Sequence, residues 1–434
     1  MRRFAFCAKT MLTLLTLLAA AYAAGVPEKV LYSFTGEPDA QYPNGVIADK
    51  SGNLYGVVAG GQGNCFSSGC GFVYQLAPVA GGGWNKTNLY AFTGGNDGGY
   101  PSAKLATDAK GTLYGTTLEG GTGSCIALQR VGCGVVFQLS QDAQGKWQYT
   151  VIYNFGTSGA NDGASPTGDL ALGGDGNFYG TTTYGGDTVC GCGIVYQLKP
   201  GPNGQWTEKV IYRFVGGTDV AFSSSGVLVD GNGQIFGTGA NGGGSANCTS
   251  GCGGVFELIP QPDGSYQEHI LHVFVGGHDG SLSSGGLVAD SKGNLFGTTI
   301  YGGGFLCNNR VATCGTVYEL KKAGSGYQES VILRFNGPNG FWPYGALVVD
   351  NADNLYGLTQ NGGGIPTLGV AFQLSNIGGK WKQTLLHIFG GAQGGQRDGM
   401  GPSSALTSDG KGGFFGTTYF GGSVGRGAVF QFLP

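Results

Sequence analysis

The sequence is poor in charged residues. Only 11% of its 434 residues are Asp, Glu, Lys or Arg, and 23 basic against 26 acidic residues give a formal net charge of −3. A surface that binds nucleic acid needs a basic patch to neutralise phosphates. The composition therefore argues against a nucleic-acid partner.

Helical periodicity is also missing. After the first 23 residues we find no segment whose apolar residues recur at helical spacing. The chain has neither an H-E-x-x-H motif nor a P-loop. We therefore expect an all-β protein, and we assign no catalytic residue and no cofactor from local motifs. An active site assembled from distant segments would leave no such motif.

The N-terminus has the features of a signal peptide. Met1-Arg-Arg-Phe is basic, residues 11–21 are apolar but too short to span a bilayer comfortably, and Ala21-Tyr-Ala23 fits a cleavage site. We expect a signal peptide over residues 1–23 and one mature domain over residues 24–434. The mature chain is expected to be secreted, periplasmic or on the cell surface.

One unit is repeated along the mature chain. In Gly286–Leu320, residues 287–289, 294–299 and 315–320 read as strands, and residues 327–335 add a fourth. The aromatic residue of the second strand recurs at intervals of about 57 to 65 residues, at Tyr55, Tyr114, Tyr179, Phe236, Phe296, Tyr356 and Phe415. The chain therefore carries seven copies of a four-stranded antiparallel unit.

The two ends of the repeat array complement each other. Residues 29–34 resemble a fourth strand without the first three, and residues 428–434 resemble a third strand without a fourth. The N-terminal strand can therefore complete the last sheet and leave no long free edge. This arrangement predicts a closed seven-bladed β-propeller rather than a solenoid, which would need polar caps.

The repeated residues resemble a known family. A GTTxxGG segment, a following GxVFxL strand and an LYxF strand with GGxDG are similar to the GloVer (Gloeobacter/Verrucomicrobia-type) tandem repeat of choice-of-anchor proteins. The resemblance covers nearly the whole mature chain. It implies an exported bacterial protein and brings no catalytic residues. Since Pro434 is reached without a hydrophobic anchor, we expect no transmembrane anchor in the mature chain, and we expect a monomer.

Ten cysteines of the mature chain fall in pairs. Each pair lies between the second and third strands of one copy, in copies one to five: Cys65/Cys70, Cys125/Cys133, Cys190/Cys192, Cys248/Cys252 and Cys307/Cys314. One pair per equivalent loop predicts five local disulfides, as export would favour. The alternative, zinc, is disfavoured because isolated pairs of thiolates without a nearby histidine make poor sites.

The disulfide loops share one face of the propeller with the connections between blades. Because long, variable loops on a rigid scaffold usually carry function, we expect the binding site on this disulfide face. Six of the seven inter-blade connections contain an aspartate: Asp39, Asp97, Asp162, Asp219, Asp279 and Asp398. Such a ring could hold calcium or a cationic ligand. Alternatively, each carboxylate accepts backbone hydrogen bonds in its own turn.

The sixth copy departs from this pattern. It replaces the aspartate by Asn339 and adds the aromatic residues Phe341, Trp342 and Tyr344. These rings could stack on a sugar or grip a peptide, or they could pack on the neighbouring blade. Among the histidines, His278 directly precedes Asp279 and is a candidate general base.

The sequence favours a non-catalytic propeller that recognises a glycan or an extracellular protein through its disulfide face. The candidate ligand-binding residues are Phe341, Trp342, Tyr344, Asp97, Asp162, Asp219 and Asp279. The alternative is a secreted hydrolase or lyase acting on polysaccharide, with acid and base carboxylates from several blades. A purely structural surface repeat is a third hypothesis.

Overall fold

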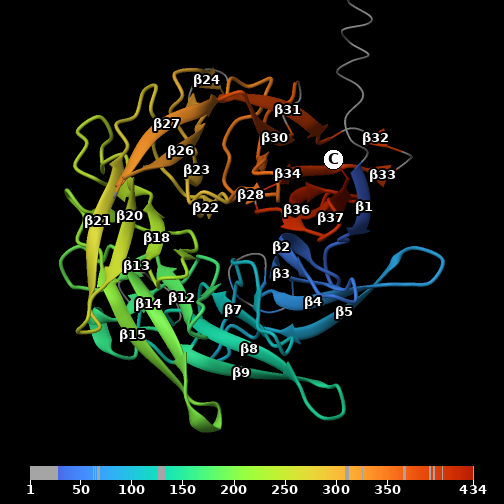
Figure 1. Cartoon of the computed structure of the whole chain (residues 1–434). Coiled ribbons are helices and arrows are strands. Elements are labelled where there is room, and N and C mark those ends of the chain that lie inside the picture. Colours follow the sequence, from blue (N-terminus) through green and yellow to red (C-terminus); the bar gives the residue numbers. More distant parts are fainter. Residues whose placement is uncertain are drawn as a thin grey trace, which may run out of the picture.

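The computed structural model describes residues 28–433, apart from residues 62, 64, 66–68, 126–131, 308–311, 325, 365–367, 391, 394–395 and 403. The predicted signal peptide, residues 1–23, lies outside the described residues. Seven antiparallel sheets surround a central axis, with β5, β9, β15, β21, β27, β31 and β1 at the perimeter (Figure 1). The predicted seven-bladed propeller is confirmed.

Blades 1 to 3 run in chain order from the axis to the perimeter. Blade 1 contains β2 (Gln41–Ala48), β3 (Leu54–Gly60), β4 (Phe72–Pro78) and β5 (Trp84–Ala91). Blade 2 contains β6 (Ala106–Thr107), β7 (Leu113–Thr117), β8 (Val135–Gln141) and β9 (Trp147–Asn154). Blade 3 contains β11 (Ala171–Leu172), β12 (Phe178–Thr182), β14 (Ile194–Pro200) and β15 (Trp206–Arg213).

Blades 4 to 6 repeat this order. Blade 4 contains β17 (Leu228–Val229), β18 (Ile235–Gly239), β20 (Gly254–Pro260) and β21 (Tyr266–Val273). Blade 5 contains β22 (Val288–Ala289), β23 (Leu295–Thr299), β26 (Thr316–Ala323) and β27 (Gly326–Arg334). Blade 6 contains β28 (Val348–Val349), β29 (Leu355–Thr359), β30 (Val370–Ile377) and β31 (Lys380–Ile388).

Blade 7 joins the two ends of the chain. Its strands are β34 (Gly399–Pro402), β35 (Thr407–Ser408), β36 (Phe414–Gly421), β37 (Ala428–Phe432) and, outermost, β1 (Glu28–Ser33). β1 pairs antiparallel with β37, from Glu28 opposite Phe432 to Ser33 opposite Ala428. The predicted closure by the N-terminal strand is therefore present.

Short elements decorate the loops. Two-residue strand pairs are β10 (Gly163–Ala164) with β13 (Tyr184–Gly185), β16 (Val220–Ala221) with β19 (Asn241–Gly242), β24 (Leu306–Cys307) with β25 (Ala312–Thr313), and β32 (Ala392–Gln393) with β33 (Gln396–Arg397). Two 3₁₀ turns span Gly159–Asn161 and Pro202–Gly204. No helix within the described part of the chain is long and apolar enough to cross a membrane.

The core lies between the blades rather than within them. All five residues of β7 are buried, whereas every residue of the outer strand β9 is half-buried or exposed. Middle strands are covered on both faces by neighbouring blades. In one apolar cluster, for example, Tyr179 and Phe214 of blade 3 pack with Phe256 of blade 4. Each blade therefore depends on two neighbours to bury its apolar faces.

A glycine in the second strand makes room for an aromatic ring of the third. Gly180 lies directly opposite Tyr196 in the ladder between β12 and β14. A Cβ atom on Gly180 would lie 2.5 Å from the Tyr196 hydroxyl oxygen and 2.6 Å from Cζ, closer than any real contact. The same crowding recurs at Gly297 beside Tyr318. The repeated Gly of the Leu-Tyr-Gly motif is thus a packing requirement.

The five predicted disulfides join Cys65–Cys70, Cys125–Cys133, Cys190–Cys192, Cys248–Cys252 and Cys307–Cys314. In every pair the carbonyl oxygen of the second cysteine accepts a backbone hydrogen bond from the next blade. Cys252, for example, accepts from Leu282 at 3.0 Å, and Cys314 accepts from Trp342 at 3.0 Å. The disulfides therefore lie beside the backbone contact between one blade and the next, which blade 6 makes without a disulfide through Gly401 and Leu368.

Replacing Cys248 and Cys252 by Ser should lower the free energy of unfolding by about 2 kcal/mol, the chain-entropy value for a loop this short. Urea unfolding under non-oxidising and non-reducing conditions measures this loss. Ser250→Ala in the same loop is the matched control and should leave stability unchanged. Equal stability of the double Ser variant and the wild type would contradict a structural role for the bridge.

Candidate functional site

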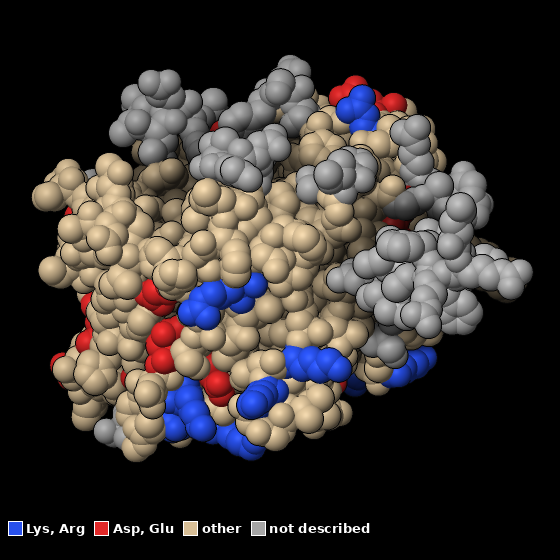
Figure 2. All heavy atoms as spheres, turned by 90° about the horizontal axis from the view of Figure 1, so that it is seen from above, with Lys and Arg blue, Asp and Glu red and all other residues tan. Residues whose placement is uncertain are grey.

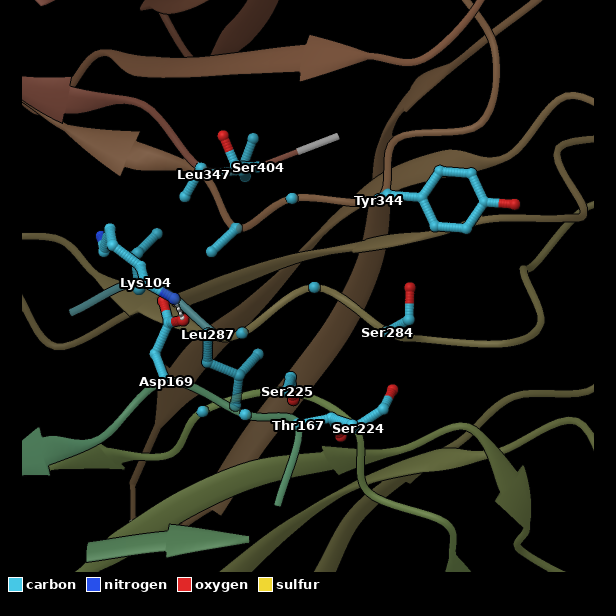
Figure 3. A pocket seen from close by; sticks show the side chains of 18 of the residues that line it. Lys104, Thr167, Asp169, Ser224, Ser225, Ser284, Leu287, Tyr344, Leu347 and Ser404 are labelled. Atoms are coloured by element: carbon cyan, nitrogen blue, oxygen red, sulfur yellow. Dashed lines mark hydrogen bonds between the residues drawn. The ribbon is translucent and has the colours of Figure 1, made fainter. Parts of the chain in front are cut away.

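A cavity of about 320 Å³ lies on the axis of the propeller. All seven blades contribute to its wall through the segments that lead into their innermost strands. Figure 3 shows side chains from these segments around the open space, with Lys104 and Asp169 on one side and Tyr344 on another. We refer to this space as the axial cavity.

In six of the blades, the segment that leads to the cavity wall contains one residue with an unusual backbone conformation. A non-glycine residue with positive φ, between 55° and 63°, occurs once in each of six blades, at Tyr42, Tyr100, Ser165, Phe222, Leu282 and Trp342. Such residues rarely adopt this conformation unless the surroundings impose it. Here both backbone groups are held: the N–H of Leu282 donates to Cys252 and its carbonyl accepts from Ile300. The wall is thus fixed by backbone bonds on both sides.

Two residues after the positive-φ position, a polar side chain lines the cavity in six blades: Asn44, Ser102, Thr167, Ser224, Ser284 and Tyr344. The hydroxyl groups of Ser102 and Ser284 have no hydrogen-bond partner among the described residues. Buried polar atoms are normally satisfied by protein, water or a ligand. The wall therefore offers hydrogen-bonding groups for a polar guest.

The charged residues of the wall lie in two adjacent blades. The backbone N–H of Lys104 donates to Oδ1 of Asp169 at 2.8 Å, and both residues are half-buried. The corresponding positions of the next four blades carry Gly226, Gly286, Ala346 and Ala405. One ammonium and one carboxylate thus face a wall that is otherwise uncharged among its described lining residues.

The channel changes character along the axis. A second space of about 440 Å³ adjoins the axial cavity and is lined mainly by aliphatic residues. Val288 and Val348 line both spaces, whereas Ile47, Leu228 and Val349 line only the second. Each inner strand begins at the disulfide face, where the inter-blade connections lie, and ends at the short turn into the second strand on the opposite face, such as Asp290–Gly293 in blade 5. The polar axial cavity therefore lies nearer the disulfide face than the apolar space does.

The predicted aspartates occupy the junctions between blades and do not line the axial cavity. Each accepts a hydrogen bond from the backbone N–H of its own turn, as Asp219 does from Val215 and Asp279 from Val275, both at 2.8 Å. Each also pairs with a side chain of the preceding outer strand: Tyr32 with Asp39, Tyr90 with Asp97, Tyr153 with Asp162, Tyr212 with Asp219, His272 with Asp279 and His387 with Asp398. The structure places them singly around the ring.

A residue from the outer strand of the next blade completes each junction. Lys86 forms an ion pair with Asp39 at 2.7 Å. In blade 6, Asn339 replaces the aspartate and its Nδ2 donates to Gln383 at 2.9 Å, while Gln383 Nε2 donates back to the Asn339 carbonyl at 3.0 Å. The missing aspartate of the sixth copy is thus matched by a neutral partner.

At two of the junctions that contain a tyrosine, the carboxyl groups of an aspartate and a glutamate lie close together. Burial, reinforced by the charge of Asp162, raises the pKa of Glu208 from 4.5 to about 7. Burial and the hydrogen bond with Asp219 raise the pKa of Glu268 to about 8, and Tyr212 donates to Glu268 at 2.8 Å. These glutamic acids stay protonated at pH values where an exposed glutamate is ionised.

The aromatic residues of the sixth copy do not form one cluster towards solvent. Phe341 is buried in the apolar core between blades 5 and 6, and Trp342 packs against it with ring centroids 5.2 Å apart. The indole Nε1 of Trp342 donates to the carbonyl of Thr313 at 3.2 Å. Tyr344 instead lines the axial cavity. The structure therefore separates Tyr344 from the other two rings.

Sequence reasoning missed Lys104, Asp169 and the two histidines His272 and His387. Lys104 and Asp169 stand where four other copies carry Gly or Ala, so an alignment of the copies would have shown them. His272 and His387 replace the tyrosine of the fourth-strand motif. The backbone carbonyl of the candidate base His278 accepts a hydrogen bond from Arg334 at 3.2 Å, whereas Asp279 pairs with His272.

Charge on the outer surface is mixed in sign. Figure 2 shows one side of the ring, where most visible Lys, Arg, Asp and Glu side chains gather in the lower half of the view and lie among one another. This side presents no large area of a single charge sign among the described residues. The outer surface in this view therefore offers no candidate site based on charge, and the axial cavity is the stronger candidate.

Comparisons with known proteins identify a repeat family. A family model described as Gloeobacter/Verrucomicrobia repeat matches residues 21–250, 128–310 and 245–434. No curated protein matches the chain. A crystal structure of a protein of unknown function from Dyadobacter fermentans DSM 18053 is similar at 12% identity, covers 94% of this chain and 97% of its own, and has a TM-score of 0.47.

The raised pKa values predict that stability falls as pH rises. Above pH 4.5 the glutamates of the unfolded chain ionise, while Glu208 and Glu268 hold their protons in the folded chain up to about pH 7 and 8. The folded state then binds more protons, so the free energy of unfolding decreases across this window. Denaturant unfolding between pH 4.5 and 8.5 measures the slope.

Glu208→Gln should flatten this profile and raise stability at pH 8, since blade 6 already carries Gln383 at the equivalent place. Glu37→Gln, at an exposed position, is the control and should keep the wild-type slope. An unchanged slope in Glu208→Gln would show that this carboxyl does not carry the effect.

Proposed function

The chain belongs to the Gloeobacter/Verrucomicrobia repeat family, and we propose that it is an exported binding propeller that takes an uncharged glycan into its axial cavity. The observation that carries this proposal is the polar wall of the cavity on the side of the disulfide face. The signal peptide predicted for residues 1–23 and the five disulfides support export. The choice-of-anchor resemblance agrees with export.

The chemistry of the wall suits a carbohydrate. The volume of the axial cavity, about 320 Å³, falls at the lower end of the range for ligand pockets, which is roughly 300–1,000 Å³. The hydroxyl groups of Ser102 and Ser284, which have no partner among the described residues, can hydrogen-bond to sugar hydroxyls, and Tyr344 supplies an aromatic ring. Lys104 and Asp169 offset each other in charge, which favours a neutral ligand.

An extracellular protein is the other partner considered from the sequence. A protein interface of ordinary size buries about 800 Å² on each side, far more than a cavity of this volume presents. A peptide terminus entering the cavity would meet mainly neutral groups. We therefore favour a glycan end over a protein, and expect a monomer to suffice because all wall residues come from one chain.

The hydrolase alternative needs two carboxyl groups on either side of the scissile bond. Among the described lining residues, Asp169 is the one carboxylate in the axial cavity. Asp97, Asp162, Asp219 and Asp279 lie in four separate junctions, where each is hydrogen-bonded. This arrangement supports binding without cleavage.

A glycan array screened in calcium and again in EDTA tests the proposal. We expect binding that is independent of calcium, since Asp169 is the one carboxylate among the described lining residues and calcium sites usually use several. For the best glycan, Tyr344→Ala should weaken affinity about fivefold, because one aromatic stack contributes about 1 kcal/mol. Lys104→Ala should also weaken binding, by loss of a donor.

Lys110→Ala replaces an exposed lysine in a turn and should bind as the wild type does. Thermal unfolding of each variant verifies that the fold is retained. If no glycan binds, or if Tyr344→Ala and Lys104→Ala both bind like the wild type, the axial cavity is not a glycan site.

A further inference from the structure

Three side chains able to bind metal meet where the ring closes. His387 comes from β31 of blade 6, Asp398 from the connection into blade 7, and Glu28 from the N-terminal strand β1. The Nε2 atom of His387 lies 2.7 Å from Asp398 Oδ2 and 3.6 Å from Glu28 Oε2. One ligand atom from each residue falls within 4.8 Å of the other two.

This closure cluster is almost completely buried. The side chains of His387, Glu28 and Asp398 are exposed by only 6%, 2% and 0%. The carboxylate of Asp398 is held in place by hydrogen bonds that its oxygens accept from the backbone N–H groups of Gly390 and Gly399. Glu28, in contrast, has one oxygen, Oε1, without any hydrogen-bond partner among the described residues. A carboxyl group buried in this way either holds a proton, as Glu208 and Glu268 do, or is neutralised by a bound cation.

Among the described residues, the same trio recurs at one other junction. His272 Nε2 lies 3.4 Å from Asp279 Oδ2, and Glu329 of the next blade completes the group. The Oε1 atom of Glu329 is likewise buried and unpartnered among the described residues. This second cluster is more accessible, with exposures of 22% for His272 and 15% for Asp279.

Two further junctions provide an internal comparison. Tyr153 with Asp162 and Glu208, and Tyr212 with Asp219 and Glu268, place the same two acids together but offer a phenol instead of an imidazole. A phenol hydroxyl donates a hydrogen bond to a carboxylate, and Oε1 of Glu208 and of Glu268 stays without a partner among the described residues, as in the histidine junctions. A neutral imidazole can instead present a lone pair to a metal ion. Histidine in place of tyrosine is therefore the feature that separates the two kinds of junction.

We propose that the two histidine junctions bind a divalent transition-metal ion of the Zn²⁺ class through one imidazole nitrogen and two carboxylates. Imidazole and carboxylate together suit Zn²⁺, with further positions left for water. Ligand atoms about 2.0–2.1 Å from a tetrahedral ion lie roughly 3.3 Å apart. The separations of 2.7 and 3.6 Å at the closure cluster bracket that value.

An ion at the closure cluster would tie three separate segments together. It would link β1 to the outer strand of blade 6 and to the connection into blade 7, beside the β1–β37 ladder that closes the ring. Binding to the folded state alone stabilises that state by mass action. The ion would therefore act as a clamp on ring closure, distinct from the glycan site on the axis.

The test uses the full mature protein, stripped with EDTA and then dialysed against ZnCl₂ or CaCl₂. Metal analysis should give two Zn²⁺ per chain, and thermal unfolding should shift to higher temperature in Zn²⁺ and not in Ca²⁺. His387→Tyr should remove one equivalent and most of the thermal shift. His272→Tyr should remove the other equivalent with a smaller shift, because that cluster is more exposed.

Tyrosine is chosen because Tyr32, Tyr90, Tyr153 and Tyr212 occupy the equivalent position in other blades. Glu28→Gln is an independent variant that reproduces the glutamine found at Gln383 of blade 6, and it should also remove the closure equivalent. Glu268→Gln, at a tyrosine junction, is the control and should leave two Zn²⁺ bound. Melting of the metal-free variants verifies folding.

Undiminished Zn²⁺ in the double variant His272→Tyr/His387→Tyr would show adventitious binding at exposed groups such as His269 and overturn the proposal. Absence of Zn²⁺ from the wild type, or stabilisation by Ca²⁺ in place of Zn²⁺, would overturn it as well. The proposal would be supported if His387→Tyr and Glu28→Gln each lost the Zn²⁺ ion bound at the closure cluster while Glu268→Gln kept both ions.

Discussion

Ring closure is the constraint on which the rest of the molecule depends. A single four-stranded sheet here has apolar residues on both faces of its middle strands, so each blade needs a neighbour on either side. In an open array the first and last blades would leave such faces and a sheet edge uncovered. The pairing of β1 with β37 removes both problems in one step, because the strand that the last blade lacks is the one that precedes the first.

Closure also explains why the candidate functional residues can be those that differ from one copy of the repeat to the next. Each blade holds its neighbour through the same backbone bonds, such as the one from Leu282 to Cys252. With the backbone fixed in this way, side chains that face the axis or the junctions are free to differ between copies. Tyr344, Lys104 and Asp169 are such differences on the axis, and His272 and His387 are differences at the junctions. The proposed glycan and metal sites both use them.

The fold was predictable because its determinants are local and repeated seven times. Strand order, the closing strand and the cysteine pairs each follow from residues close together in the chain. Blade 5 agrees with its predicted strands to within a few residues at their ends. The disulfide pairing could be inferred since each loop holds only two cysteines.

The candidate sites were less predictable because their contacts join blades that are distant in sequence. Lys86 meets Asp39 across 47 residues, and Gln383 meets Asn339 across 44. No local pattern predicts such pairs. The direction of a side chain was equally hidden: Phe341, Trp342 and Tyr344 are sequence neighbours, yet only the last lines the axial cavity. From the sequence, the six aspartates suggested a ring of carboxylates around the channel. In the structure each lies at its own junction between blades, so a whole blade stands between one aspartate and the next.

The most direct test of the account compares thermal unfolding of the chain that begins at residue 24 with that of a chain that begins at residue 35 and lacks β1. Loss of β1 exposes the edge of β37 and removes one wall of the last junction, so we predict a lower and broader transition. A synthetic peptide of residues 28–34 should restore the original transition when added in excess. If the shortened chain melts at the same temperature and as cooperatively as the longer one, closure by the N-terminal strand does not hold the propeller together.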